Sequence, residues 1–181
     1  MSENSLWAFE RSLLRSSVSS TAFWSEDRRF GVRLAEEVLR YMLHTCRQSC
    51  PHETGGILVG YYVDTLDCAV VTAATTAPSD SRKGSMWFHR GTFGLQPWLN
   101  SLWQRKHNYY LGEWHFHPYA PPSPSQTDAE QMGSIANALS YHCPEPLLLI
   151  IGGDPAVEWT VGVYVFPREK SSLKVLLPID T

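Results

Sequence analysis

Two histidines one residue apart, His115 and His117, are the clearest chemical signal in this sequence. They belong to the segment Gly-Glu-Trp-His-Phe-His-Pro at residues 112–118. Side chains alternate across a β-strand, so both imidazoles are expected on the same side of it. Ten residues lie between His117 and Asp128, an acidic third ligand candidate. Two nitrogens and one carboxylate oxygen are a ligand set for a catalytic zinc that keeps its fourth position open.

Such a site also needs a carboxylate that accepts a proton from the activated water and passes it to the leaving group. Glu113 precedes His115 by two residues and is expected on the same strand face. Glu53 is the second candidate, because it stands just before two glycines that open an apolar segment. Periodicity favours Glu113 slightly and leaves the choice between the two open.

Ser125 and Asp128 together form the pattern Ser-x-x-Asp, which is also a helix capping box. One serine can serve both purposes, because capping would hold its hydroxyl close to the metal. Glu113 likewise has a second interpretation, as an acceptor for the N–H of a metal-binding histidine.

A second cluster of metal-capable side chains is less convincing. It comprises His44, Cys46, Cys50 and His52. The cluster lacks the Cys-x-x-Cys spacing of structural zinc sites and crosses the expected end of a helix. We therefore do not expect structural zinc there.

Hydrophobic periodicity predicts an α/β chain that would position these residues. We expect helices near residues 34–46, 93–107 and 125–139. A mixed sheet of about six or seven strands is expected, with six strands at 55–63, 66–73, 108–115, 147–151, 157–165 and 173–177. Segments 28–32 and 86–89 are candidates for a further short strand. Residues 1–22 are assigned to an N-terminal arm, either a short amphipathic helix with a flexible Ser-rich link or a frayed end, and residues 23–181 to a single domain.

Composition narrows the class of protein. The chain has 181 residues, 43% of them hydrophobic, and a formal net charge of -3, so a globular domain is expected and nucleic acid is not expected as the main partner. The longest aliphatic run, residues 147–151, is too short to span a bilayer. We find no secretory signal pattern and no disulfide framework among the four cysteines, and expect a soluble cytoplasmic protein without a membrane partner.

Glu53 with the following Thr-Gly-Gly-Ile-Leu-Val-Gly, then His115-x-His117-Pro118 and Ser125-x-x-Asp128, resembles the JAMM (MPN+) metallopeptidase motif. The resemblance covers about residues 30–178 and implies a cytidine-deaminase-like α/β/α sandwich. It implies one zinc ion on His115, His117 and Asp128, with Glu53 as general base and acid and Ser125 as oxyanion donor. The family usually has Ser or Thr between the histidines, whereas this chain has a phenylalanine.

The resemblance also implies an activity. The family hydrolyses isopeptide or peptide bonds after the C-terminal glycine of ubiquitin or ubiquitin-like proteins. The string Gly-Glu-Trp-His-x-His-Pro looks like the bacterial antiphage branch, whose members accompany E1/E2-like enzymes. We favour the CBASS branch, in which the substrate is a conjugated CD-NTase, over the branch that acts on a bacterial ubiquitin-like protein. The alternatives are a peptidase that processes a linear tail and a non-catalytic MPN scaffold.

Two segments flank the expected site and are predicted to hold the extended C-terminal tail of the substrate. They are residues 80–90 and 119–124. Within the first, Met86, Trp87, Phe88 and His89 are the candidates for pairing with the tail by strand addition.

Overall fold

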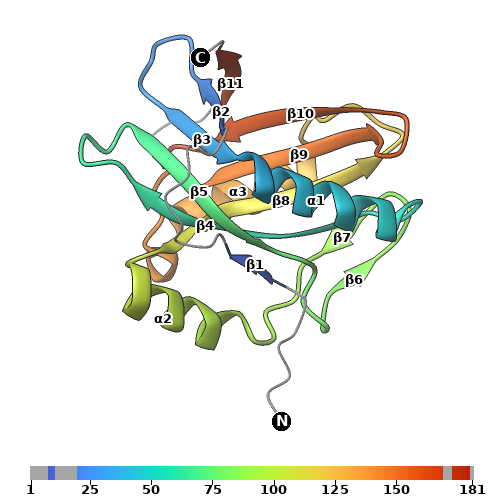
Figure 1. Ribbon diagram of the computed structural model, residues 1–181, viewed down its shortest axis with the longest axis horizontal. Coiled ribbons are helices and arrows are strands. Elements are labelled where there is room, and N and C mark those ends of the chain that lie inside the picture. Colours follow the sequence, from blue (N-terminus) through green and yellow to red (C-terminus); the bar gives the residue numbers. More distant parts are fainter. Residues whose placement is uncertain (1–7, 11–19, 169–172, 180–181) are drawn as a thin grey trace.

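A mixed β-sheet of nine strands dominates the structure, a computed structural model that describes residues 8–10, 20–168 and 173–179 (Figure 1). Its spatial order is β1-β5-β3-β2-β11-β10-β9-β8-β4. The pairs β3–β5 and β8–β9 are parallel, and the other pairs are antiparallel. The strands are β1 (Ala8–Glu10), β2 (Ser20–Trp24), β3 (Gly31–Ala35), β4 (Thr54–Tyr62), β5 (Cys68–Thr75), β8 (Tyr109–Pro118), β9 (Leu147–Asp154), β10 (Glu158–Val165) and β11 (Lys174–Ile179).

The sheet closes on itself, because β5 pairs with β4 as well as with β3. Eight strands thus form a closed ring, in the order β5-β3-β2-β11-β10-β9-β8-β4 and back to β5. The strand β1 pairs with residues 73–75 of β5, beyond the residues that pair with β3. The α/β class and the mixed sheet are confirmed. The predicted α/β/α sandwich is not confirmed in detail, because β4 and β5 pair with each other and close the sheet.

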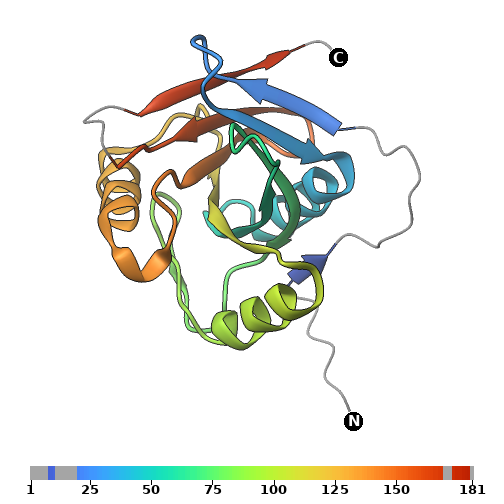
Figure 2. The same cartoon turned by 90° about the vertical axis from the view of Figure 1, so that its left-hand side faces the viewer.

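Three α-helices cover the sheet, namely α1 (Glu36–Ser49), α2 (Leu95–Lys106) and α3 (Gln126–Asn137). The sheet curves around α1, while α2 and α3 lie on its outer side (Figures 1 and 2). Val38, Met42 and Cys46 of α1 are fully buried at helical spacing and pack into the inner core. A second core joins Leu102 of α2 and Met132 of α3 to the outward side chains of the sheet. The strands β4, β8 and β9 therefore bury apolar side chains on both faces, in agreement with their continuous buried runs.

The strand β8 carries a register shift that determines which side chains face outward. Leu58 of β4 pairs with Gly112 and Val59 with Tyr110, so Leu111 has no partner on β4. Gly112 has a φ of 151° and lies so close to β9 that a Cβ would be 2.0 Å from the Leu147 carbonyl oxygen. Such a bulge changes the phase of the alternation along a strand.

The phase change is visible in what the β8 side chains contact. Leu111 belongs to the inner core, and so do Trp114 and Phe116, which lie three and five residues further on. His115 and His117 therefore share the opposite, outer side, where α3 packs. Phe116, the departure from the family pattern, is fully buried in the inner core.

Most sequence-predicted elements are confirmed within a few residues, with four differences. The sheet has more strands than predicted, because β2 replaces part of the expected Ser-rich link and β1 forms inside the expected arm. The segment 82–89 forms a separate two-stranded hairpin of β6 (Arg82–Lys83) and β7 (Phe88–His89), whereas only a strand at 86–89 was expected. The helix proposed for the arm is wrong for residues 8–10, and the rest of that arm up to residue 19 lies outside the described residues. The predicted helix start at residue 34 is also wrong, because β3 continues to Ala35.

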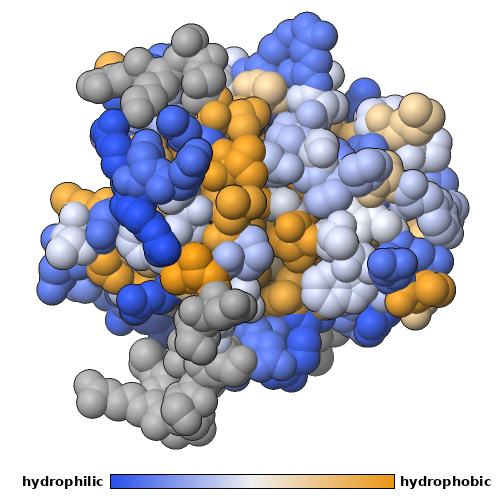
Figure 3. All heavy atoms as spheres, turned by 90° about the horizontal axis from the view of Figure 1, so that it is seen from above, coloured by the Kyte–Doolittle hydropathy of each residue, from blue (hydrophilic) through white to orange (hydrophobic). Residues whose placement is uncertain are grey.

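The surface seen from above mixes apolar and hydrophilic patches (Figure 3). Val175 and Leu177 of β11 contribute exposed apolar side chains to the surface.

Among the described helices, none has the length and apolarity needed to cross a bilayer.

Candidate active site

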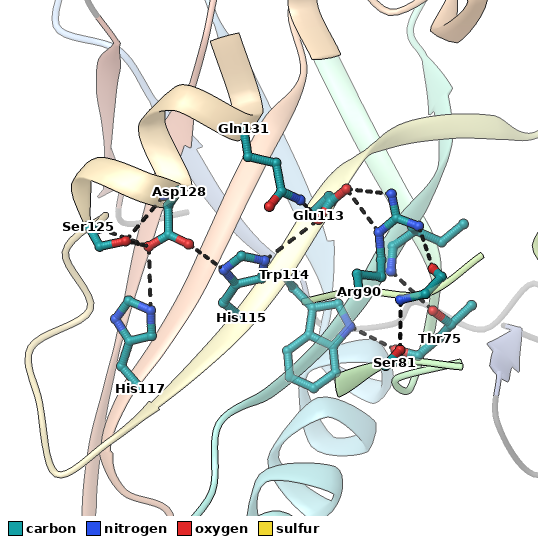
Figure 4. A network of polar contacts seen from close by, with 12 residues as sticks. Thr75, Ser81, Arg90, Glu113, Trp114, His115, His117, Ser125, Asp128 and Gln131 are labelled. Carbon is teal, nitrogen blue, oxygen red and sulfur yellow. Dashed lines mark hydrogen bonds and ion pairs between the residues drawn. The ribbon is translucent and has the colours of Figure 1, made fainter. Parts of the chain in front are cut away.

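The two histidines of β8 and the aspartate of α3 converge at the outer side of the sheet (Figure 4). His115 Nδ1 lies 2.8 Å from one carboxylate oxygen of Asp128, and His117 Nε2 lies 3.6 Å from the other. One candidate ligand atom from each residue falls within 4.8 Å of the others. Within the described part of the chain, this is the one group of three or more such side chains with that geometry.

The first turn of α3 fixes the direction of the Asp128 carboxylate. Ser125 is the N-cap, and its hydroxyl oxygen accepts a hydrogen bond from the Asp128 backbone N–H at 3.1 Å. In return, Asp128 Oδ2 accepts from the Ser125 backbone N–H at 2.8 Å and from its hydroxyl at 2.7 Å. The predicted capping box is confirmed, and it leaves Oδ1 of Asp128 directed at His115.

The charges of the three side chains depend on one another. Burial alone would lower the pKa of His115, but the contacts with the carboxylates of Asp128 and Glu113 outweigh it and raise the pKa to about 9. Burial raises the pKa of Asp128, and the contacts with His115 and Ser125 reverse this and hold it far below its ordinary value. For His117, burial lowers the pKa. The Asp128 carboxylate is thus stabilised in its charged form beside the two imidazoles.

A divalent metal ion fits these residues. Two imidazoles and one carboxylate match the three protein ligands of a catalytic zinc. His115 Nε2 is buried and has no hydrogen-bond partner among the described residues, whereas Nδ1 fixes the ring through its hydrogen bond with Asp128 Oδ1 at 2.8 Å. Asp128 is 8% exposed and His117 is partly exposed, so an open coordination position would face the adjoining cleft.

A cleft of about 430 Å³ adjoins this group and contains Glu53. The register of β4 and β8 pairs Thr54 with Phe116, so extending the pairing by one residue places Glu53 opposite His117. Opposed residues of an antiparallel pair share a face of the sheet. The cleft is lined by Glu53, Ser85, Met86, Trp87, Phe88, His117, Pro118, Ala120, Pro121, Ser123, Ser125, Thr127 and Asp128.

Glu53 and Glu113 lie in different surroundings. Glu53 is half-buried at the cleft, and its pKa is raised by burial and by the charge of Asp128, with His115 opposing the rise. Glu113 is fully buried and does not line the cleft. Burial would raise its pKa, but the contacts with His115 and Arg90 hold the pKa below its ordinary value.

Three partners of Glu113 were not identified from the sequence. Arg90 donates to Glu113 Oε1 through Nε at 2.9 Å and Nη2 at 2.7 Å, and Gln131 donates to Oε2 at 2.9 Å (Figure 4). The Tyr110 hydroxyl lies 3.4 Å from Oε1. A buried carboxylate must have such partners, but no local pattern reveals which residues supply them.

Two further sequence expectations can be compared with this geometry. Met86, Trp87 and Phe88 line the cleft, whereas His89 does not. The Phe88 ring also stands edge-on to the His115 ring, with centroids 5.6 Å apart. In the second cluster, residues 44–52, the described side chains do not converge on a common point as a metal-ligand set would.

Comparison with known proteins identifies the family. The model of prokaryotic homologues of the JAB domain matches residues 35–162, which include all five residues of the predicted motif. The chain belongs to the prokaryotic JAB family. The predicted resemblance to JAMM peptidases is therefore confirmed.

Relatives of this JAB-family chain carry names that indicate hydrolases. A protein of Enterobacter hormaechei subsp. hoffmannii named CD-NTase/cGAS isopeptidase is 38% identical over 161 residues, 89% of each chain. A protein with the same name from Escherichia coli is 29% identical over 67% of this chain and 75% of its own length. A probable metalloprotease, y4qB of Sinorhizobium fredii, is 27% identical over 67% of this chain and 76% of its own length. The assignment of the chain to the hydrolases is thus confirmed.

The fold also has a solved counterpart. The solution structure of protein DSY2949 from Desulfitobacterium hafniense superimposes with a TM-score of 0.52 and is 19% identical. The match covers 81% of this chain and 88% of that protein, and supports the shared α/β fold alone.

Proposed function

We propose that this chain is a zinc-dependent isopeptidase that releases a CD-NTase from the amine of a protein to which its C-terminus has been conjugated, in bacterial antiphage (CBASS) signalling. The observation that carries the proposal is the convergence of His115, His117 and Asp128 beside a cleft that contains Glu53. The relatives named CD-NTase/cGAS isopeptidase support the choice of substrate. An E1/E2-like enzyme that forms the conjugate is the expected functional partner.

In this proposal His115, His117 and Asp128 hold the zinc ion. When bound, the ion polarises the scissile carbonyl and lowers the pKa of a water molecule. The carboxylate of Glu53 accepts the proton of the attacking water and returns it to the nitrogen of the leaving amine. The shared cleft of Glu53, His117 and Asp128 supports this role, because a base must lie near the proton that it moves.

Glu113 is assigned a supporting role. Both of its oxygens accept hydrogen bonds, from Arg90 and from Gln131, and its side chain is fully buried. A carboxylate held in this way has no free path to a water molecule in the cleft.

Ser125 is proposed to donate a hydrogen bond to the oxyanion that forms on the scissile carbonyl. In the structure its hydroxyl donates to Asp128 Oδ2. The hydroxyl can turn toward a substrate carbonyl, because the Ser125 backbone N–H still donates to Asp128 Oδ2 at 2.8 Å. Ser125 is exposed and lines the cleft, which supports this role.

The substrate tail is proposed to bind along the hairpin β6–β7, which forms a sheet of two strands separate from the closed ring. Met86 is 85% exposed and Trp87 54% exposed, and both line the cleft. Large apolar side chains with this exposure commonly mark binding surfaces. An extended tail can pair with the hairpin by strand addition while these side chains cover it.

The deciding experiment incubates the purified protein with two purified conjugates, one of a CD-NTase and one of a ubiquitin-like protein, each linked to a lysine amine. We expect release of the CD-NTase with zinc present, no release after chelation, and recovery when zinc is restored. Glu53→Gln should slow release by about 10²- to 10⁴-fold, whereas Glu130→Gln, on the exposed side of α3, should match the wild type.

Other outcomes would redirect the proposal. Preferred release of the ubiquitin-like protein would move the chain to the sister branch. Absence of release from either conjugate by zinc-loaded protein would support a non-catalytic scaffold.

A further inference from the structure

An arginine lies buried behind the candidate metal site. The Arg90 side chain is 6% exposed, and the Glu113 carboxylate that it contacts is 0% exposed. Removing two charges from water is costly, and replacing such a pair by apolar residues often does not reduce stability. The presence of this pair behind a catalytic centre therefore points to a role other than stability.

The two oxygens of Glu113 face different partners (Figure 4). Oε1 accepts both Arg90 contacts, at 2.9 Å and 2.7 Å. Oε2 accepts from Gln131 at 2.9 Å and faces His115 Nε2 at 3.6 Å. Arg90 and Gln131 thus fix the carboxylate in one orientation, with Oε2 directed at the histidine nitrogen that points away from Asp128.

His115 is consequently held between two carboxylates. Its Nδ1 lies 2.8 Å from Asp128 and its Nε2 faces Glu113. Histidine ligands commonly donate their other ring N–H to a carboxylate, which fixes the tautomer and the ring plane.

Arg90 also lies at the base of the hairpin that lines the cleft. It directly follows β7, and its Nη1 donates to the Gly91 carbonyl at 2.9 Å. The other side of the hairpin is tied to the site as well, because the Glu53 backbone N–H donates to the Gly84 carbonyl at 3.0 Å. The Arg90 side chain therefore connects the β6–β7 hairpin to Glu113, the carboxylate that faces His115.

We propose that Arg90 is a positioning residue, which fixes Glu113 so that His115 is oriented for zinc and the hairpin is held beside the site. The geometry of a guanidinium suits this task, because two N–H groups reach one oxygen while a third reaches the Gly91 carbonyl. A lysine at the same place offers a single charged group and cannot reproduce these contacts.

The proposal rests on the zinc site of the proposed function, and its test measures zinc binding directly. Zinc affinity is determined by competition with a chromogenic chelator for the wild type and for Arg90→Lys. We expect affinity to fall about 10- to 100-fold, the range found when groups supporting a metal ligand are removed. Arg168→Lys is the matched control, because the Arg168 Nε donates to the Ala136 carbonyl at 2.6 Å and has no contact with the metal group.

A double variant, Arg90→Gln with Glu113→Gln, removes both buried charges together and so guards against a misfolded single variant. It should fold, as judged by circular dichroism, and still bind zinc more weakly than the wild type. A merely structural role would lower the unfolding temperature of the Arg90 and Arg168 variants alike and leave zinc affinity unchanged.

The outcomes separate the two proposals. Wild-type affinity for zinc in folded Arg90→Lys and in the double variant would overturn the positioning role and leave the proposed function standing. Failure of the wild type itself to bind zinc would overturn the proposed function and the positioning role together.

Discussion

Glu53 and Glu113 have the same side chain but differ in their access to the cleft, because Glu53 is half-buried and Glu113 is fully buried. One lies at the rim of a cleft, and the other is fully buried against Arg90. Sequence periodicity favoured Glu113 slightly because it records which face of a strand a residue occupies. Periodicity does not record what covers that face, and here Gln131 of α3 and the segment carrying Arg90 cover it.

Replacing Glu53 with Gln should lower kcat by about 10²- to 10⁴-fold, the usual contribution of a positioned acid–base group. Because the base acts in its deprotonated form, wild-type activity should decline as pH falls through the Glu53 pKa. Burial and the Asp128 charge place that pKa above its ordinary value of 4.5. The measurement is kcat/KM against pH with zinc saturating throughout. Retention of full activity by Glu53→Gln would transfer the base role elsewhere.

The candidate metal ligands could be predicted from the sequence because they are close together in it. His115 and His117 share one strand, and Asp128 follows in the next helix. Arg90 and Gln131 could not be predicted, because they lie 23 and 18 residues from Glu113 and meet it only through tertiary packing.

At the level of elements, the sequence predicted well those segments whose pattern is local. The neighbouring strands β4 and β5 and the Ser125 cap of α3 depend on nearby residues, and all three were expected. The strand β2 was missed because its five residues begin in a Ser-rich stretch and pair with β3 and with the distant β11. Short strands are defined by such non-local partners more than by their own composition.

The hairpin β6–β7 should affect substrate binding more than chemistry. Trp87→Ala is expected to raise KM for a protein conjugate about tenfold, the effect of losing roughly 1.4 kcal/mol at a binding surface. The kcat of the zinc-loaded enzyme should change little. Leu139→Ala, which also removes an exposed apolar side chain (74% exposed), is the control because it lies outside the cleft. Unchanged KM in Trp87→Ala would exclude Trp87 from the substrate surface.

At the level of the whole molecule, a metal ion would join parts of the chain that are otherwise linked by a proline-rich loop. His115 and His117 belong to the closed ring, and Asp128 to a helix packed outside it. An ion bound by all three would therefore add a cross-link to the folded state that the unfolded chain lacks.

Zinc should accordingly stabilise the fold. At a free zinc concentration 100 times its dissociation constant, the free energy of unfolding should rise by about 2.7 kcal/mol. The measurement compares denaturant unfolding of metal-free and zinc-loaded protein. His117→Ala should remove most of the zinc effect while leaving the metal-free stability close to that of the wild type, because His117 is only partly buried. Equal stability of wild-type protein with and without zinc would contradict the prediction.

The bulge at Leu111 and Gly112 has a consequence for how this chain can change in length. Downstream of Gly112, alternate residues of β8 face the inner core and the metal group. Inserting or deleting one residue between Gly112 and Trp114 would turn both histidines into the inner core and would turn Trp114 to the outer side, where α3 packs, whereas a change of two residues would leave each side chain on its present side. We therefore expect this segment of β8 to tolerate insertions or deletions of an even number of residues only. The turn between β4 and β5 carries no such restriction.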